Sequence, residues 1–248
     1  MFLVTMAFKR RISWPKRSDL PMILSVGILQ MATVLALINL GLARVPAGRS
    51  AILAYTMPLW VAPGGVLFLG EKLTRGKILA VILGLAGVAV MFNPFDFDWS
   101  NSQGVIGNGF LLGAAAIWAG TIVHVRGHRW TSTPLELAPW QMLLGLLPLT
   151  ALAWTVEGPP PSFELSPTTL LVMFYSGPVI TAFPFWASVT VSRALPAVTT
   201  SLVFLLVPVM GLLSASAILG EPLSAATVAG LLLIVAGVAT VNLAGAKQ

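Results

Sequence analysis

A stretch of 44 residues occurs twice in this chain, and this repeat restricts the possible folds more than any other feature. Pro46–Ala89 aligns with Pro196–Ala239 at a shift of 150 residues without a gap, and 12 of the 44 positions are identical. The two copies share a proline (Pro58 and Pro208), a Gly-Glu step and a Gly-Val-Ala ending in one register. Each copy therefore predicts an apolar helix containing a proline, a short Gly-Glu-x-Leu turn and a second apolar helix. Proline-interrupted apolar segments at matching places in two halves are typical of membrane transporters.

The composition predicts a membrane protein. Hydrophobic residues make up 57% of the 248 residues, charged residues make up 9%, and the mean hydropathy is +0.92. A soluble domain has about 25% charged residues, so this chain cannot cover a globular surface with polar groups, and we expect the lipid bilayer to be its solvent. The net charge of +6 lies in short clusters between apolar runs, which favours membrane orientation over nucleic-acid binding. The absence of cysteine excludes a disulfide framework and a thiolate metal site.

The apolar runs are long enough to cross a bilayer as helices. An open sheet would leave backbone groups unpaired in lipid, and the runs do not alternate as barrel strands do. We therefore predict an all-α, polytopic membrane helix bundle with about eight full spans, preceded by a short apolar stub at Met1–Phe8. The predicted spans are residues 20–42, 48–69, 74–93, 105–125, 136–156, 168–191, 197–219 and 224–244.

The loops indicate how these spans are oriented. If the basic loop Lys9–Arg17 is cytoplasmic and every span crosses, 12 of the 14 Lys and Arg residues lie in the cytoplasm, and only Arg44 and Arg49 lie outside. This asymmetry follows the positive-inside rule. The turn after Gly70, which contains Lys72, is then cytoplasmic, whereas the matching turn in the second copy has no Lys or Arg and is external. The two copies are therefore predicted to be inverted repeats, related by an axis in the membrane plane.

At the two Gly-Glu-x-Leu turns the chain resembles the EamA-type transporters of the drug/metabolite transporter superfamily. The segment Leu111–Ala119 is similar to the helix that opens a repeat in that family, with Trp118 followed by a small residue. The Ala51–Pro58 run and the basic Lys9–Arg17 loop are also similar to the family pattern. The resemblance covers essentially the whole chain and implies inverted five-helix repeats in the bacterial cytoplasmic (inner) membrane.

The same resemblance implies a division of the chain into repeats, of which the first is incomplete. The first repeat covers residues 1–93, an external connector covers 94–104, and the second repeat covers 105–248. Compared with the ten helices usual in the family, the first helix and half of the second are absent. Two spans of about 20 residues each imply a start about 40–60 residues upstream. We therefore expect Met1 to be an internal methionine or the chain to be a fragment.

Polar and aromatic residues within the spans are the candidates for a substrate cavity. Buried amides in lipid need partners, so an asparagine or glutamine in a span is expected to face the bundle. Trp118 and Tyr55 lie deep in their spans, where they could stack on a substrate, while interfacial packing is the alternative for a residue such as Trp186. The candidate cavity residues are Asn39, Tyr55, Trp118, Thr121, Tyr175 and Trp186.

Each feature that the two copies of the repeat share has two interpretations. Pro58 and Pro208 remove a helical hydrogen bond, so they either form gating kinks beside a cavity or fix a static bend. The turn residues Gly70, Glu71, Gly220 and Glu221 are interpreted as structural, because a carboxylate near a helix N-terminus caps free N–H groups. A proton relay is the less favoured interpretation of the two glutamates.

No Asp, Glu, Lys or Arg lies in the middle of a predicted span, so the coupling ion stays open, with protons as the candidate. His124 and His128 have the spacing of a metal pair, but no third ligand is near them in the sequence, and we expect neither a metal nor a cofactor. The sequence also has no pattern typical of a catalytic site. We therefore expect a protein that is not an enzyme.

These observations together predict a transporter, with an exporter favoured, of small organic solutes that works by alternating access. The resemblance implies amino acids, related metabolites or drugs as solutes. The alternative is a non-transporting truncated fragment or a membrane scaffold. A monomer is expected, and the substrate, the direction of transport and the coupling ion stay open.

Overall fold

The computed structural model describes residues 14–45, 47–92, 102–159, 166–219 and 224–245, and every regular element among them is a helix. The structure confirms the predicted all-α, polytopic bundle. The helices are η1 (Arg17–Asp19), α2 (Leu20–Leu24), η2 (Ser25–Thr33), α3 (Val34–Leu42), α4 (Ala47–Ala54), α5 (Met57–Leu69), α6 (Arg75–Phe92), α7 (Ser102–Gly127), α8 (Pro134–Glu157), α9 (Pro167–Phe174), η3 (Tyr175–Ala182), α10 (Phe183–Ala194), α11 (Ala197–Phe204), α12 (Leu206–Leu219) and α13 (Ala225–Gly245).

Among the described residues, five helical stretches are long and apolar enough to cross a membrane. They are Arg17–Leu42, Ser102–Gly127, Pro134–Glu157, Pro167–Ala194 and Ala197–Ile218. The apolar helices Met57–Leu69 and Ala225–Val241 are shorter. The predicted total of about eight spans remains a prediction.

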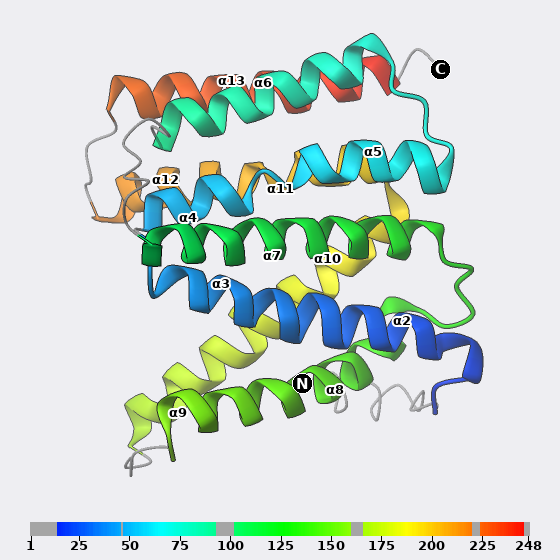
Figure 1. Ribbon diagram of the computed structural model, residues 1–248, viewed down its shortest axis with the longest axis vertical. Coiled ribbons are helices and arrows are strands. Elements are labelled where there is room, and N and C mark those ends of the chain that lie inside the picture. Colours follow the sequence, from blue (N-terminus) through cyan, green and yellow to red (C-terminus); the bar gives the residue numbers. More distant parts are fainter. Residues whose placement is uncertain (1–13, 46, 93–101, 160–165, 220–223, 246–248) are drawn as a thin grey trace.

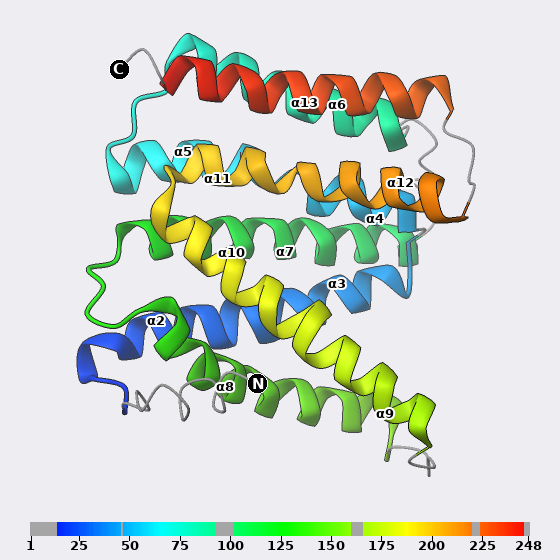
Figure 2. The same ribbon diagram turned by 180° about the vertical axis from the view of Figure 1, so that it is seen from behind.

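The helices form two layers, which Figures 1 and 2 show from opposite sides. One layer contains α6, α4–α5, α7, α2–η2–α3 and α8, and the other contains α13, α11–α12 and α9–η3–α10. The larger core cluster joins the layers through buried side chains such as Met57, Ile122, Leu202 and Ile234. The first layer therefore contains elements from before and after the connector, whereas every element of the second layer follows it.

The irregular parts of the helices recur at the shift of 150 residues that relates the two sequence copies. The π-helical segment η2 starts at Ser25 and η3 starts at Tyr175, so the structural repeat extends upstream of the sequence repeat. The next helix of each half is also interrupted at matching positions, between α4 and α5 at Tyr55–Thr56 and between α11 and α12 at Leu205. π-Helical turns inside α-helices occur frequently at functional sites.

The pair α6 and α13 shows the inverted relation most directly. The two helices run antiparallel along one edge of the bundle (Figure 1). A Cβ atom added at Gly87 would lie 2.6 Å from the carbonyl oxygen of Gly230, and one added at Gly237 would lie 2.8 Å from that of Ala80. Glycine at these positions lets the two backbones approach closely, which is the usual way to pack helices in lipid.

Most of the described basic residues gather at one end of the bundle, here called the basic end. The start of α2, the end of α5, the start of α6, the end of α7 and the end of α10 all lie there (Figure 1). Arg44 follows α3 at the opposite end. The charge asymmetry read from the sequence is thus an asymmetry between the two ends of the fold, and the positive-inside rule assigns the basic end to the cytoplasm.

Candidate functional site

A central cavity of about 620 Å³ lies between the two layers. No charged side chain lines it among the described residues, and most of its wall is apolar or aromatic. Both π-helical segments contribute to the wall, so the irregular part of each repeat borders the cavity. The lining residues are Gln30, Met31, Val34, Leu35, Ile38, Tyr55, Trp118, Ile180, Thr181, Phe183, Pro184, Phe185, Ala187, Ser188, Val191, Phe204 and Val207.

Two of the predicted cavity residues, Tyr55 and Trp118, meet in this wall. Tyr55 lies in the interruption between α4 and α5, and Trp118 lies near the middle of α7. The Trp118 ring packs against Phe204 at the end of α11, with ring centroids 5.7 Å apart and planes tilted by 32°. The buried indole N–H of Trp118 has no hydrogen-bond partner within the described part of the chain. This donor is available to a solute that carries an acceptor.

Gln30 and Ser188 form a polar contact across the cavity. The Gln30 amide, in η2, donates to the Ser188 hydroxyl, in α10, over a long 3.5 Å. The Ser188 hydroxyl in turn donates to the carbonyl oxygen of Phe185 at 2.8 Å. A long bond of this kind is weak, so the amide can exchange it for a bond to a bound solute. In the sequence, Gln30 is recognisable as a candidate because it is an amide in an apolar span. Nothing in the sequence distinguishes Phe204 from other apolar residues.

The other four predicted cavity residues lie outside the cavity wall. Asn39 is exposed on α3 and donates to the carbonyl oxygen of Leu35 at 2.8 Å. Thr121 is buried in α7 and donates to the carbonyl oxygen of Ile117 at 2.8 Å. Tyr175 is 55% exposed at the start of η3. Trp186 packs against Phe183, with ring centroids 5.8 Å apart, and only Phe183 of the two lines the cavity.

The two repeat prolines follow the interruptions of their helices. Pro58 is the second residue of α5, and Pro208 is the third residue of α12. Proline lacks an N–H and is tolerated in the first turn of a helix, where no intrahelical bond is lost. Each predicted proline-containing helix is therefore two helices in the structure, with Tyr55 and Leu205 at the breaks.

The first Gly-Glu turn caps helices of both repeats. Gly70 ends α5 in the left-handed conformation, with φ of 65°, which glycine adopts without strain. Glu71 Oε1 accepts a hydrogen bond from the backbone N–H of Ala197 at 2.6 Å, and Glu71 Oε2 lies 3.7 Å from Lys77 Nζ. Glu71 therefore caps α11 of the other repeat, while Thr74 accepts from the Lys77 N–H in the first turn of α6. Gly220 and Glu221 lie outside the described residues.

Asp19 is a buried carboxylate that also joins the two repeats at the basic end. Its side chain accepts hydrogen bonds from the hydroxyls of Thr131, at 2.6 Å, and Ser132, at 2.8 Å. Further along the chain, the Ser25 hydroxyl is 2.8 Å from Nδ1 of His124. In the sequence, Asp19 is an acidic residue just before an apolar span, and nothing there indicates its hydrogen-bond partners. Together with Glu71, these contacts tie the repeats together on the cytoplasmic side.

Within the described part of the chain, no three His, Cys, Asp or Glu residues gather as a metal site would require. The rings of His124 and His128 contact each other edge to face, with centroids 5.6 Å apart.

A comparison with protein families identifies the group to which this chain belongs. The model of the EamA-like transporter family matches residues 1–93 and 105–243. The chain belongs to the EamA-like transporter family. The resemblance read from the Gly-Glu-x-Leu turns is confirmed, and the chain is an integral, multi-pass membrane transporter of small solutes rather than an enzyme.

Relatives agree with this assignment. The chain is 26% identical over 241 residues to an uncharacterized transporter of Archaeoglobus fulgidus, covering 96% of this chain and 82% of that one. It is 28% identical over 229 residues to a probable amino-acid metabolite efflux pump of Salmonella typhimurium, covering 86% of this chain and 72% of that one. A solved crystal structure has the same fold, with a TM-score of 0.78 and 20% identity, covering 98% of this chain and 84% of that one.

Proposed function

We propose that this chain exports small organic solutes across the bacterial cytoplasmic membrane and that the solute binds in the central cavity. The observation that carries the proposal is the cavity wall, which contains residues from both repeats and no described charge. A cavity with few polar groups in an otherwise apolar wall is the usual form of a small-molecule site.

The cavity favours neutral or zwitterionic solutes with an apolar part, such as amino acids and related metabolites. Tyr55, Trp118 and Phe204 offer aromatic surface. The indole N–H of Trp118 and the amide of Gln30 offer donors, which suit the carboxylate or carbonyl of such a solute. A solute with an uncompensated net charge would pay a large desolvation cost in this wall. The Salmonella typhimurium relative, a probable amino-acid metabolite efflux pump, supports this class.

Export would proceed by alternating access between the repeats at residues 1–93 and 105–248, which the external connector at 94–104 links. In the described conformation, Glu71 and Asp19 hold the repeats together at the basic end. Releasing these contacts would open the cavity to the cytoplasm. The interruptions before Pro58 and Pro208 supply places where each repeat can bend beside the cavity.

Transport measurements in vesicles test this function. The full chain, reconstituted in lipid vesicles, should move radiolabelled neutral amino acids and related metabolites down a gradient faster than protein-free vesicles do. The same assay with and without an imposed pH gradient determines whether protons are coupled. A panel of neutral amino acids, aromatic metabolites and drugs that shows no flux above that of protein-free vesicles would overturn the proposal.

Replacing both prolines tests their gating role. We expect the Pro58→Ala, Pro208→Ala double variant to transport solute several-fold more slowly, because each alanine supplies an N–H that lets the interrupted helix close into one stiffer rod. Initial rates in vesicles measure the effect. Pro139→Ala in α8 is a matched control, since this helix continues through its proline. Unchanged rates in a double variant with normal helix content would remove the gating role.

A further inference from the structure

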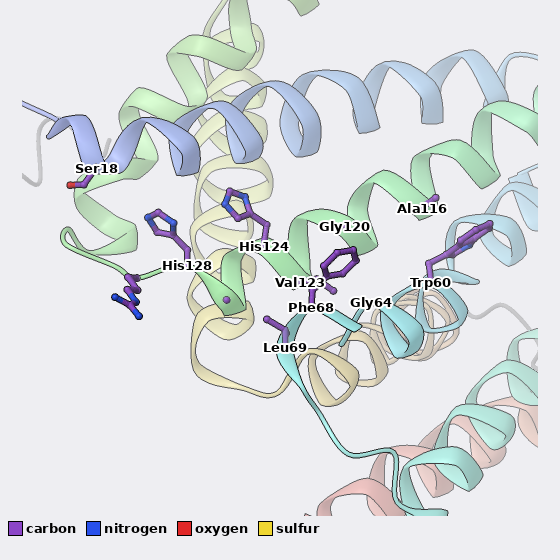
Figure 3. Close-up of a pocket in the computed structure, with 12 residues that line it drawn as sticks. Ser18, Trp60, Gly64, Phe68, Leu69, Ala116, Gly120, Val123, His124 and His128 are labelled. Atoms are coloured by element: carbon purple, nitrogen blue, oxygen red, sulfur yellow. The ribbon is translucent and has the colours of Figure 1, made fainter. Parts of the chain in front are cut away.

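A second cavity, of about 830 Å³, lies between α5 and α7 toward the basic end, and it shares no lining residue with the central cavity. Figure 3 shows it as a groove over α7, with Phe68 and Trp60 from α5 on one side and His124 and His128 at one end. Phe68 is 80% exposed and Trp60 is 45% exposed, so the groove opens outward from the bundle. In a membrane this outer surface meets lipid.

The groove is apolar along its length because small residues form its floor. Gly64 of α5 and Ala116 and Gly120 of α7 line it beside the side chains of Phe68 and Val123. A Cβ atom added at Gly120 would meet no heavy atom within 4 Å, so close helix packing does not explain this glycine. Gly120 instead leaves open space that an alkyl chain can fill.

The end of the groove nearest the loop after α7 is polar and cationic. Ser18, His124, His128 and Arg129 line this end. Nε2 of His128 is buried and has no hydrogen-bond partner in the described part of the chain. The His128 ring is held in place by edge-to-face contacts with His124 and with Trp130, at 5.6 and 6.0 Å between centroids. Arg129 is exposed and forms no ion pair with a described carboxylate.

We infer that this groove binds an anionic phospholipid of the cytoplasmic leaflet. The headgroup phosphate would lie between Arg129 and His128, and one acyl chain would lie over Gly120. A cationic pocket between helices at the cytoplasmic surface complements the negative charge of such a lipid. Arginine is well suited to a phosphate because its planar guanidinium can donate two parallel hydrogen bonds. The apolar groove distinguishes a lipid from a free phosphate, which would gain nothing from it.

Lipid titration of the full chain in detergent tests the inference. Native mass spectrometry and thermal unfolding should show tighter binding and greater stabilisation with phosphatidylglycerol than with phosphatidylcholine of the same acyl chains. Arg129→Ala should weaken phosphatidylglycerol binding about tenfold, which corresponds to the loss of roughly 1.4 kcal/mol. Gly120→Leu should weaken the binding of phosphatidylglycerol by filling the floor of the groove.

Arg75→Ala provides the matched control, because Arg75 is an exposed cation at the basic end that does not line the groove. This variant should keep the wild-type preference for phosphatidylglycerol. Equal binding of both lipids by the wild-type chain would overturn the inference. Full stabilisation by soluble glycerol phosphate, with no effect of Gly120→Leu, would also overturn it, since it would indicate a phosphate site without an acyl chain.

Discussion

Replacing Trp118 with alanine should lower the initial rate of solute transport about 100-fold at low solute concentration, which corresponds to about 2.8 kcal/mol. The change removes aromatic surface from the wall of the central cavity together with an indole N–H that has no described partner. It also removes the packing of Trp118 on Phe204, through which α7 contacts α11. Transport of the solute identified in the vesicle screen gives the rate.

Trp118→Phe separates the two contributions of this side chain. Phenylalanine keeps an aromatic ring beside Phe204 but has no N–H, so we expect about a tenfold loss, in the range of one hydrogen bond to a charged acceptor. Trp154→Ala is the matched control, because Trp154 is 59% exposed on α8 and does not line the cavity. If both Trp118 variants transport at the wild-type rate with an intact fold, the solute does not bind beside this ring.

Replacing Glu71 with alanine should open the central cavity to the cytoplasm and slow export. The variant loses the 2.6 Å hydrogen bond to the Ala197 N–H, which joins the end of α5 to the start of α11 in the other repeat. A hydrogen bond to a charged group contributes roughly 1.5–3 kcal/mol. A loss of this size shifts the equilibrium between closed and open basic ends by about ten- to a hundredfold. Glu71→Gln keeps one acceptor oxygen and should show a smaller shift.

The absence of natural cysteine makes this shift measurable. Ala187→Cys places a single thiol in the cavity wall, and a membrane-impermeant thiol reagent added to the cytoplasmic side reports its accessibility. Labelling should rise in the Glu71→Ala background and stay unchanged with Glu136→Gln. Glu136 is a suitable control because it caps its own helix, accepting from the Thr133 N–H at 2.7 Å. Equal labelling in the wild-type, Glu71→Ala and Glu136→Gln backgrounds would show that Glu71 does not hold the basic end closed.

The sequence predicted the class of the fold well because that class follows from properties of single segments. A run of about 20 apolar residues must be a helix in lipid, whatever its neighbours are. The register of the two copies predicted one proline-containing helix in each, whereas the structure divides each of them into two helices just before Pro58 and Pro208. The π-helical segments η2 and η3 recur at the same shift, but they lie outside the aligned stretch and carry few identical residues.

The candidate cavity residues were harder to predict. Tyr55 and Trp118 line the central cavity, whereas Asn39 and Tyr175 are exposed on helix surfaces. A spanning helix is apolar on every face, so its periodicity does not indicate which face points toward the bundle. The cavity residue Phe204 therefore resembles any other apolar residue until the neighbouring helices are in place.

The repeat that begins at Pro46, with its Gly-Glu turn and the charge of its loops, predicted an inverted-repeat membrane transporter, and the chain belongs to the EamA-like transporter family. Only the tertiary structure decided what Glu71 does. The sequence shows this carboxylate just before α6, but its partner is the N–H of Ala197, 126 residues away. Helix formation and the positions of turns follow from the chain's own backbone and its solvent. Contacts between distant segments depend on how the helices rotate and pack against one another.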